Sequence, residues 1–140
     1  MQDSQNLKQK ELTEKIIGFA YCVHRTLGAG FLEKVYENAL AHELRKNGLK
    51  VAQQAPIAVF YDEQRVGEYF ADLLIEDNVV CELKAGEAIS KQHEVQLVNY
   101  LVATGIEVGL LINFGAGVTV RRKFRTYRKP HAVVNPAKSC

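Results

Sequence analysis

Gly-Glu-Tyr-Phe-Ala-Asp-Leu-Leu-Ile-Glu-Asp-Asn-Val-Val-Cys-Glu-Leu-Lys, residues 67–84, is the most informative stretch of this 140-residue chain. Acidic residues and an asparagine at 76–78 interrupt two apolar-rich runs, which predicts two strands joined by a short turn. A turn centred on Asp77 places Leu73 opposite Cys81. One side of this hairpin is then entirely apolar and is expected to face a core. Its residues are Ala71, Leu73, Ile75, Val79, Cys81 and Leu83.

The opposite side of the same hairpin brings charges together at one end. In this register Asp72 lies opposite Glu82, with Cβ atoms about 5 Å apart, and like charges at that distance are destabilising. Lys84 lies two residues beyond Glu82 and points to the same side. A cation between the carboxylates would relieve their repulsion, and oxygen-only ligands suit Mg²⁺ or Mn²⁺. The alternative is a solvent-facing hairpin in which Lys84 neutralises Glu82.

The composition suits one globular domain over residues 1–140, with its core expected at about 10–128 and a frayed tail. Apolar residues make up 47% of the chain, which excludes a disordered protein. No apolar run approaches the ~20 residues that span a bilayer, and residues 1–10 lack a signal-peptide core, so we expect no membrane partner. The cysteines are odd in number and widely spaced, which favours reduced thiols in a cytoplasmic protein. They are Cys22, Cys81 and Cys140.

Apolar periodicity predicts helices and strands in the order ααβββαββ. The helices are expected at about 12–27, 32–46 and 91–104, and the strands at about 50–61, 65–75, 79–84, 108–114 and 118–127. This order predicts an α/β (α+β) fold with a central mixed β-sheet flanked by helices. The run 108–114 is typical of a strand buried on both faces, and the helix before it allows a parallel crossover. Pro56 indicates either that the first strand lies at an edge of the sheet or that the strand starts irregularly there.

Polar residues on the predicted helices are further candidates for a site. Glu33 opens the second helix, where a carboxylate is favourable simply because of the helix dipole. Gln96 and Tyr100 are four residues apart and therefore stack on one face of the third helix. His93 lies on the same flank, where it could contact a site or only solvent. His24 lies beside an apolar helix face, which favours a partly buried histidine with its hydrogen bonds made.

These residues fall into motifs that resemble a known nuclease superfamily. Asp72, nine intervening residues and Glu82-Leu83-Lys84 resemble the PD-(D/E)XK core. Gln96-Leu97-Val98-Asn99-Tyr100 resembles the QxxxY motif of its exonuclease-type branch, and Gly30-Phe31-Leu32-Glu33-Lys34-Val35-Tyr36 matches the signature of the GxxExxY protein family, which is assigned to the same superfamily. The resemblance covers about residues 11–122 and implies a restriction-endonuclease-like fold. One departure is Ala71, which stands where the motif has proline before its aspartate.

The resemblance implies a metal site and assigns residues to it. Asp72, Glu82 and the backbone carbonyl of Leu83 would hold Mg²⁺ or Mn²⁺. Glu33, brought in from its helix, would add a carboxylate directly or through water. These residue types suit the chemistry, because a metal ion polarises the phosphate and lowers the pKa of its bound water.

The resemblance also implies a reaction and the residues that assist it. Lys84 would orient or help deprotonate the attacking water and offset charge on the scissile phosphate. Gln96 and Tyr100 would position the substrate backbone or Lys84. The implied activity is a metal-dependent nuclease that hydrolyses phosphodiester bonds in nucleic acid, in DNA rather than RNA.

Two alternatives to an active nuclease stay open. The chain could be a nucleic-acid-binding module that keeps the fold without turnover, or a protein-interaction module within a larger complex. A chain of 140 residues has no separate target-recognition domain, so a homodimer or a larger complex could supply specificity.

The charge is unevenly placed, although the formal net charge is only +2. No acidic residue follows Glu107, whereas seven basic residues do: Arg121, Arg122, Lys123, Arg125, Arg128, Lys129 and Lys138. The segment 121–129 could follow a phosphate backbone, with Phe124 and Tyr127 stacking on bases. The alternative is an edge strand whose basic side chains oppose aggregation.

Overall fold

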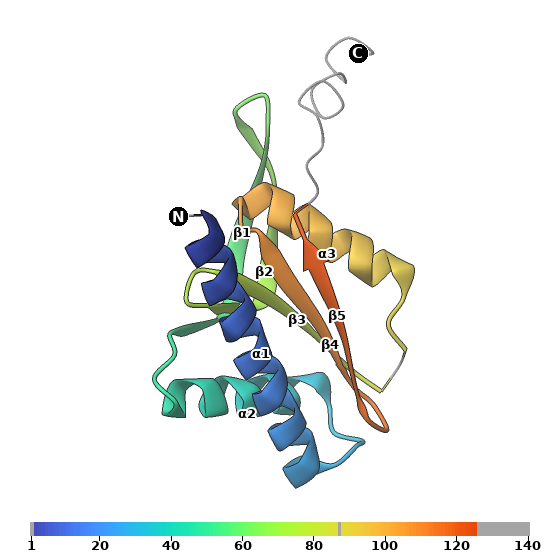
Figure 1. Ribbon diagram of the computed structural model, residues 1–140. Helices are drawn as coiled ribbons and strands as arrows, with labels where there is room; N and C mark the ends of the chain where they lie inside the picture. Colours follow the sequence, from blue (N-terminus) through green and yellow to red (C-terminus); the bar gives the residue numbers. More distant parts are fainter. Residues whose placement is uncertain (1, 87, 126–140) are drawn as a thin grey trace.

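A computed structural model describes residues 2–86 and 88–125, and the side chains from residue 7 onward within them. The elements follow the predicted order (Figure 1). They are α1 (Gln2–Leu27), α2 (Glu33–Lys46), β1 (Val51–Tyr61), β2 (Gln64–Ile75), β3 (Val79–Ala85), α3 (Lys91–Thr104), β4 (Val108–Phe114) and β5 (Val118–Phe124). Tyr127, Arg128, Lys129, Lys138, Cys140 and the tail that was expected to fray lie outside the described residues.

The five strands form one mixed sheet in the order β1-β2-β3-β4-β5. Neighbouring strands are antiparallel except β3 and β4, which are parallel and joined through α3, as the sequence predicted. One core cluster lies between the sheet and α1 with α2, and a second lies between the other face and α3 (Figure 1). This confirms a central sheet flanked by helices. None of the described helices is long and apolar enough to cross a bilayer.

The β2–β3 hairpin has the predicted register, with Leu73 opposite Cys81. Its turn contains Glu76 and Asp77 at φ 54° and 52°, and aspartate is one of the few non-glycine residues enriched in this region. The apolar side is buried under α1 and α2, with one exception. Ala71 was expected there but packs in the cluster beneath α3.

The exception at Ala71 has a local cause in the backbone. Gln54 on β1 has φ 50°, which breaks the regular alternation of side chains, and it lies between the paired residues Gln53↔Leu73 and Ala55↔Ala71. The β2–β3 ladder also ends at Leu73. On the hairpin side of this point Leu73 and Ile75 pack in the cluster under α1 and α2, whereas Ala55 and Ala71 pack in the cluster under α3. The two strands therefore exchange core faces at Asp72.

The first two helices differ from the prediction at their ends. α1 begins at Gln2 rather than near Leu12, because residues 2–11 are mostly good helix formers although they lack apolar periodicity. α2 begins at Glu33 rather than at residue 32, because Leu32 is its N-cap residue and is 80% exposed; Val35 in its first turn is also exposed. The buried positions of α2 are Tyr36, Glu37, Leu40, Ala41 and Leu44.

Buried strands and thiols follow the expectations. All seven residues of β4 are buried, and Pro56 lies on β1, an edge strand. Cys22 and Cys81 are free cysteines, and Cys81 is fully buried. Burial raises the pKa of the Cys81 thiol far above its ordinary value, which makes it unreactive.

The Leu97 side chain of α3 packs directly against Gly109 of β4. A Cβ atom added at Gly109 would lie 2.9 Å from Cδ1 of Leu97, 3.1 Å from its Cγ and 3.2 Å from its Cδ2. Leu97 itself is fully buried, so its side chain has no free space to occupy. The glycine therefore sets how closely the third helix approaches β4.

We expect Gly109→Ala to lower the free energy of unfolding by about 1–3 kcal/mol, the usual cost of overpacking a tight core. Gly18→Ala is the matched control, because Gly18 lies in α1 and an added Cβ atom there would have no neighbour within 4 Å. It should raise the free energy of unfolding by up to about 1 kcal/mol through helix propensity. Urea unfolding measures both; equal stability of Gly109→Ala and wild type would show that the helix does not rest on this contact.

Candidate active site

Two carboxylates replace the backbone ladder where β2 and β3 diverge. The backbone N–H of Asp72 donates to Oε2 of Glu82 at 2.8 Å. The backbone N–H of Leu83 donates to Oδ2 of Asp72, also at 2.8 Å. Asp72 and Glu82 therefore lie side by side, as the hairpin register predicted, but they are joined through their side chains.

The pair lies in an environment that disfavours two negative charges. Burial raises the pKa of Glu82 to about 8, and the neighbouring charge of Asp72 adds to this effect. The hydrogen bond from the Asp72 backbone and the charge of Lys84 act in the opposite direction. The protonated form of Glu82 is therefore favoured at neutral pH. A bound cation would take the place of that proton.

Lys84 and Glu33 lie near this pair without hydrogen bonding to it. Lys84 is half-buried, and its ammonium makes no hydrogen bond or ion pair within the described part of the chain. Burial raises the pKa of Glu33, which Lys84 lowers and Asp72 raises further. Glu33 is thus within electrostatic reach of both, although it opens α2 on the other face of the sheet. The structure brings these predicted residues together around an available ammonium.

Glu37 of α2 is connected to the carboxylate pair by hydrogen bonds, a role that sequence reasoning missed. Glu37 is only 2% exposed and pairs with Lys34 at 3.0 Å. Gln54 Nε2 donates to Oε1 of Glu37 at 2.8 Å and to Oδ1 of Asp72 at 3.1 Å. Glu37 lies four residues after Glu33, a spacing that places both on one flank of the helix but does not by itself indicate a site. No sequence signal pointed to Gln54, whose positive φ directs its amide between the two carboxylates.

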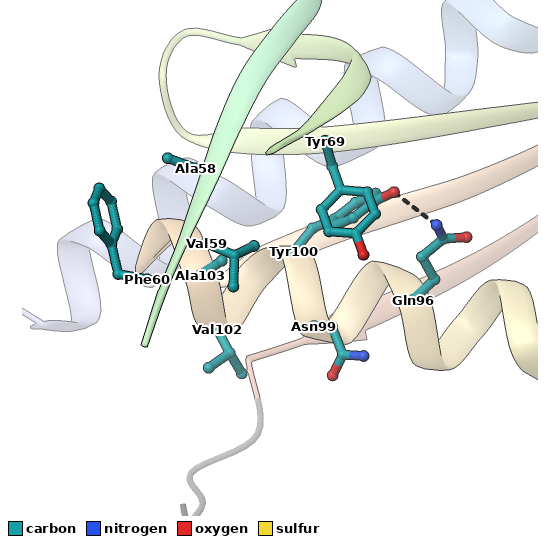
Figure 2. Close-up of a pocket in the computed structure, with 9 residues that line it drawn as sticks. All are labelled: Ala58, Val59, Phe60, Tyr69, Gln96, Asn99, Tyr100, Val102 and Ala103. Carbon is teal, nitrogen blue, oxygen red and sulfur yellow. Dashed lines mark hydrogen bonds between the residues drawn. The ribbon is translucent and has the colours of Figure 1, made fainter. Parts of the chain in front are cut away.

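Gln96 and Tyr100 were predicted to stack on one face of α3, and Tyr100 is the residue of this pair that packs in the buried cluster next to the carboxylates. Gln96 Nε2 donates to the Tyr100 hydroxyl at 2.7 Å (Figure 2). Burial raises the pKa of Tyr100, and the charge of Glu82 adds to the shift. The Tyr69 ring lies 5.3 Å from the Tyr100 ring, centroid to centroid. α3 thus presents one hydrogen-bonded pair between the carboxylates and the β1–β2 hairpin.

Asn113 is a further residue that sequence reasoning missed. It is paired in register with Lys84 on the neighbouring parallel strand, so both side chains lie on the same face. Asn113 is 5% exposed, and its Oδ1 has no hydrogen-bond partner among the residues that the structure describes. A buried acceptor without a partner is costly and often marks a functional position. The only hint in the sequence is a single amide within an apolar run.

His93 and His24, the two histidines considered in the sequence analysis, have structural roles. Nδ1 of His93 accepts from the Ser90 backbone N–H at 3.2 Å, and the His93 N–H donates to Oγ of Ser90 at 3.1 Å. This reciprocal pair caps the N-terminus of α3. Nε2 of His24 lies 2.8 Å from the Gly115 carbonyl oxygen, so the favoured interpretation of a partly buried, hydrogen-bonded histidine is confirmed.

The four basic residues assigned to nucleic-acid binding do not gather into one free surface. β5 is an edge strand, and alternation places Arg122 on the opposite face from Arg121 and Lys123. Lys123 pairs with Glu94 at 2.7 Å, which lowers the pKa of that glutamate. Arg125 pairs with Glu107 and donates to the Gly105 carbonyl.

The donor set suits a hard divalent cation bound by few protein ligands. Within residues 2–86 and 88–125, no group of three or more acidic, cysteine or histidine side chains is arranged to hold a metal ion. Asp72 and Glu82 instead form a close pair with oxygen atoms only. Mg²⁺ commonly uses one or two carboxylates and completes its coordination with water and phosphate. Asp72 and Glu82 therefore fit such an ion, and Glu33 is not part of this close pair.

Comparisons with known proteins agree with this geometry. A model of the PD-(D/E)XK nuclease superfamily matches residues 10–127. The crystal structure of SSO0001 aligns with a TM-score of 0.52 at 17% identity, over 76% of this chain and 56% of that one. An alkaline exonuclease from Laribacter hongkongensis aligns with a TM-score of 0.52 at 12% identity, over 76% of this chain and 60% of that one. No curated protein matches significantly.

These alignments confirm the expected restriction-endonuclease-like fold and go no further, because identities are low. The chain spans less than two thirds of the length of either structure. The narrower assignment to the GxxExxY family stays a prediction.

The raised pKa of Glu82 predicts how the metal-free protein responds to pH. The protonated carboxyl is favoured in the folded state, so its stabilising contribution is complete below the ordinary pKa of 4.5 and is lost as the pH rises through about 8. One such group changes the free energy of unfolding by at most about 1.4 kcal/mol per pH unit.

We expect urea unfolding in EDTA to show falling stability between pH 6 and 9 for the wild type, and a flatter profile for Glu82→Gln. The amide keeps an oxygen to accept from the Asp72 N–H but does not titrate. Identical slopes for the two proteins would show that Glu82 is already ionised at pH 6.

Proposed function

The chain belongs to the PD-(D/E)XK nuclease superfamily, and we propose that it is a metal-dependent nuclease that hydrolyses phosphodiester bonds, in DNA rather than RNA. One observation carries the proposal: two half-buried carboxylates, each held by a backbone N–H of the opposite strand, lie near an ammonium that has no ion pair among the described residues. A purely structural site would be expected to pair the ammonium with a carboxylate. The alkaline exonuclease among the structural neighbours also supports a nuclease.

We assign the metal ligands to Asp72, Glu82 and the backbone carbonyl of Leu83, with Mg²⁺ or Mn²⁺ as the ion. When bound, the ion would polarise the phosphate and lower the pKa of a bound water molecule. The Leu83 N–H holds one Asp72 oxygen, and the Asp72 N–H holds one Glu82 oxygen. These bonds orient both carboxylates before any ligand arrives. Glu33 would contribute from α2 through water.

Lys84 is the residue we assign to the attacking water and to the charge that develops on the phosphate. Its half-buried ammonium makes no competing ion pair in the described chain and is therefore available to a substrate. On the α3 side Gln96 Nε2 donates to the Tyr100 hydroxyl, and these two side chains would hold the substrate backbone. Asn113 on β4 is paired in register with Lys84 on β3, and its buried amide would position the Lys84 side chain.

A binding module without turnover is the alternative, and the basic residues of β5 bear on it. Lys123 and Arg125 are engaged in ion pairs, so phosphate binding there would have to compete with Glu94 and Glu107. We therefore propose that nucleic acid is bound chiefly at the carboxylate site. A partner subunit, a second copy or a larger complex would supply any sequence specificity.

Asp72→Asn should abolish calorimetric Mn²⁺ binding and reduce metal-dependent cleavage of DNA at least a hundredfold, because it removes a charged ligand. Lys84→Ala should reduce cleavage comparably while leaving metal binding intact. Asp77→Asn is the matched control. It lies on the same hairpin, is exposed and pairs with Lys50, far from the site.

Wild-type protein that binds Mn²⁺ but cuts neither DNA nor RNA, single- or double-stranded, would contradict the proposed turnover. Cleavage that persists in Asp72→Asn would show that the active site lies elsewhere or that the activity is a contaminant.

The bridge from Glu37 to Asp72 gives a second test. Gln54→Met keeps the length of the side chain but loses both hydrogen bonds, so we expect Mn²⁺ affinity to fall about 10- to 100-fold, as when outer partners of metal ligands are removed. Gln53→Met is the matched control, because Gln53 donates to Glu37 but not to Asp72. Equal losses in the two variants would mean that the effect passes through Glu37 or through general stability.

A further inference from the structure

A groove opens between α3 and the strands β1 and β2 (Figure 2). Its cavity volume is about 520 Å³, within the range of small-molecule sites. The lining residues are Ala58, Val59, Phe60, Tyr69, Gln96, Asn99, Tyr100, Val102 and Ala103. Only Gln96 and Tyr100 belong to the motifs discussed above, so most of this surface has no role in the proposed reaction.

The lining has the chemistry of a base-binding surface. It contains no charged side chain, so it offers nothing to neutralise a phosphate. It does contain exposed aromatic rings at Phe60 and Tyr69, and amides at Gln96 and Asn99. Nucleobases stack on aromatic rings, and their polar edges can hydrogen bond to amides. A neutral groove with these groups suits a base and not the backbone.

Tyr69 is placed to provide the stacking surface. Its ring is tilted by 43° against Tyr100, so the inner side is supported while the residue remains 47% exposed. Tyr100 is almost completely buried and cannot offer a comparable surface. Support by a second ring fixes the orientation of the first, which reduces the entropy lost when a base stacks on it.

The groove lies next to the carboxylates. Tyr100 lines the groove and packs in the same buried cluster as Ala71, which directly precedes Asp72 on β2. A phosphate held at Asp72 and Glu82 would therefore have its neighbouring nucleotide at the mouth of the groove. In a regular duplex that base is paired and stacked, so it could enter only after leaving the stack.

We propose that the groove binds an unpaired base adjacent to the scissile phosphate, so that the substrate is single-stranded nucleic acid or an unpaired strand end. This inference rests on the proposed nuclease function, because the phosphate is cleaved only if the protein is a nuclease. The groove itself can be tested without any cleavage.

The test uses a single-stranded oligonucleotide that carries the fluorescent base 2-aminopurine, mixed with the protein in EDTA so that nothing is cut. Stacking on Tyr69 should quench the fluorescence. Tyr69→Ala should lose the quenching and weaken binding roughly 5- to 150-fold, the range for removing one stacked base contact. Tyr69→Phe should retain both, because the ring remains.

Tyr61→Ala is the matched control, since Tyr61 is an exposed tyrosine of β1 outside the groove lining. It should quench and bind like the wild type. In Mg²⁺, cleavage of single strands by Tyr69→Ala should show a raised KM with kcat little changed, and wild type should prefer single strands or frayed ends over blunt duplex.

Unchanged quenching in Tyr69→Ala, or the same loss in Tyr61→Ala, would overturn the inference. So would a groove that seats a second copy of the chain, seen as a Tyr69-dependent dimer in sedimentation without quenching. Quenching that requires Tyr69, with no cleavage by wild type of any substrate, would support the groove and contradict the proposed nuclease. Cleavage that depends neither on strandedness nor on Tyr69 would support the proposed nuclease and contradict the proposed role of the groove.

Discussion

Two carboxylates occupy the place of backbone hydrogen bonds between β2 and β3, and the site depends on this substitution. Beyond Leu73 the strands no longer pair through their main chains. Asp72 and Glu82 each accept one N–H from the opposite strand, which satisfies those donors and holds the carboxylates together. The hydrogen bonds stabilise an arrangement that the charges oppose. The resulting strain is local, and a proton or a cation relieves it.

The surrounding elements support this pair from both faces of the sheet. On one side α2 contributes buried Glu37, which reaches Asp72 through Gln54. On the other side α3 contributes Tyr100 and its partner Gln96. The strands change core faces at the same point, so groups from opposite layers converge on one position. A sheet with uninterrupted alternation would have kept the two sets of side chains apart.

Much of this arrangement could be predicted from the sequence, because it follows from short-range periodicity. The hairpin register and the proximity of Asp72 to Glu82 follow from a period of two and an acidic turn. Ala71 was misplaced because alternation does not foresee a glutamine at positive φ on the neighbouring strand. Gln54 and Asn113 are single polar residues without a spacing pattern, so only three-dimensional contacts identify them. Sequence likewise shows the charge of Lys123 but not its partner Glu94, which comes from another element.

The contact of Leu97 with Gly109 makes the two walls of the groove unequal. The buried side chain of Leu97 already touches the backbone of β4 at Gly109, so α3 cannot move inward, and moving outward would open a void beside that leucine. The facing wall is an edge hairpin whose far end projects from the sheet (Figure 1). The groove therefore has one wall, α3, that is held in place, and one wall, the β1–β2 hairpin, that can move. Any ligand too wide for it must displace the hairpin, while Gln96 and Tyr100 keep their distance from the carboxylates.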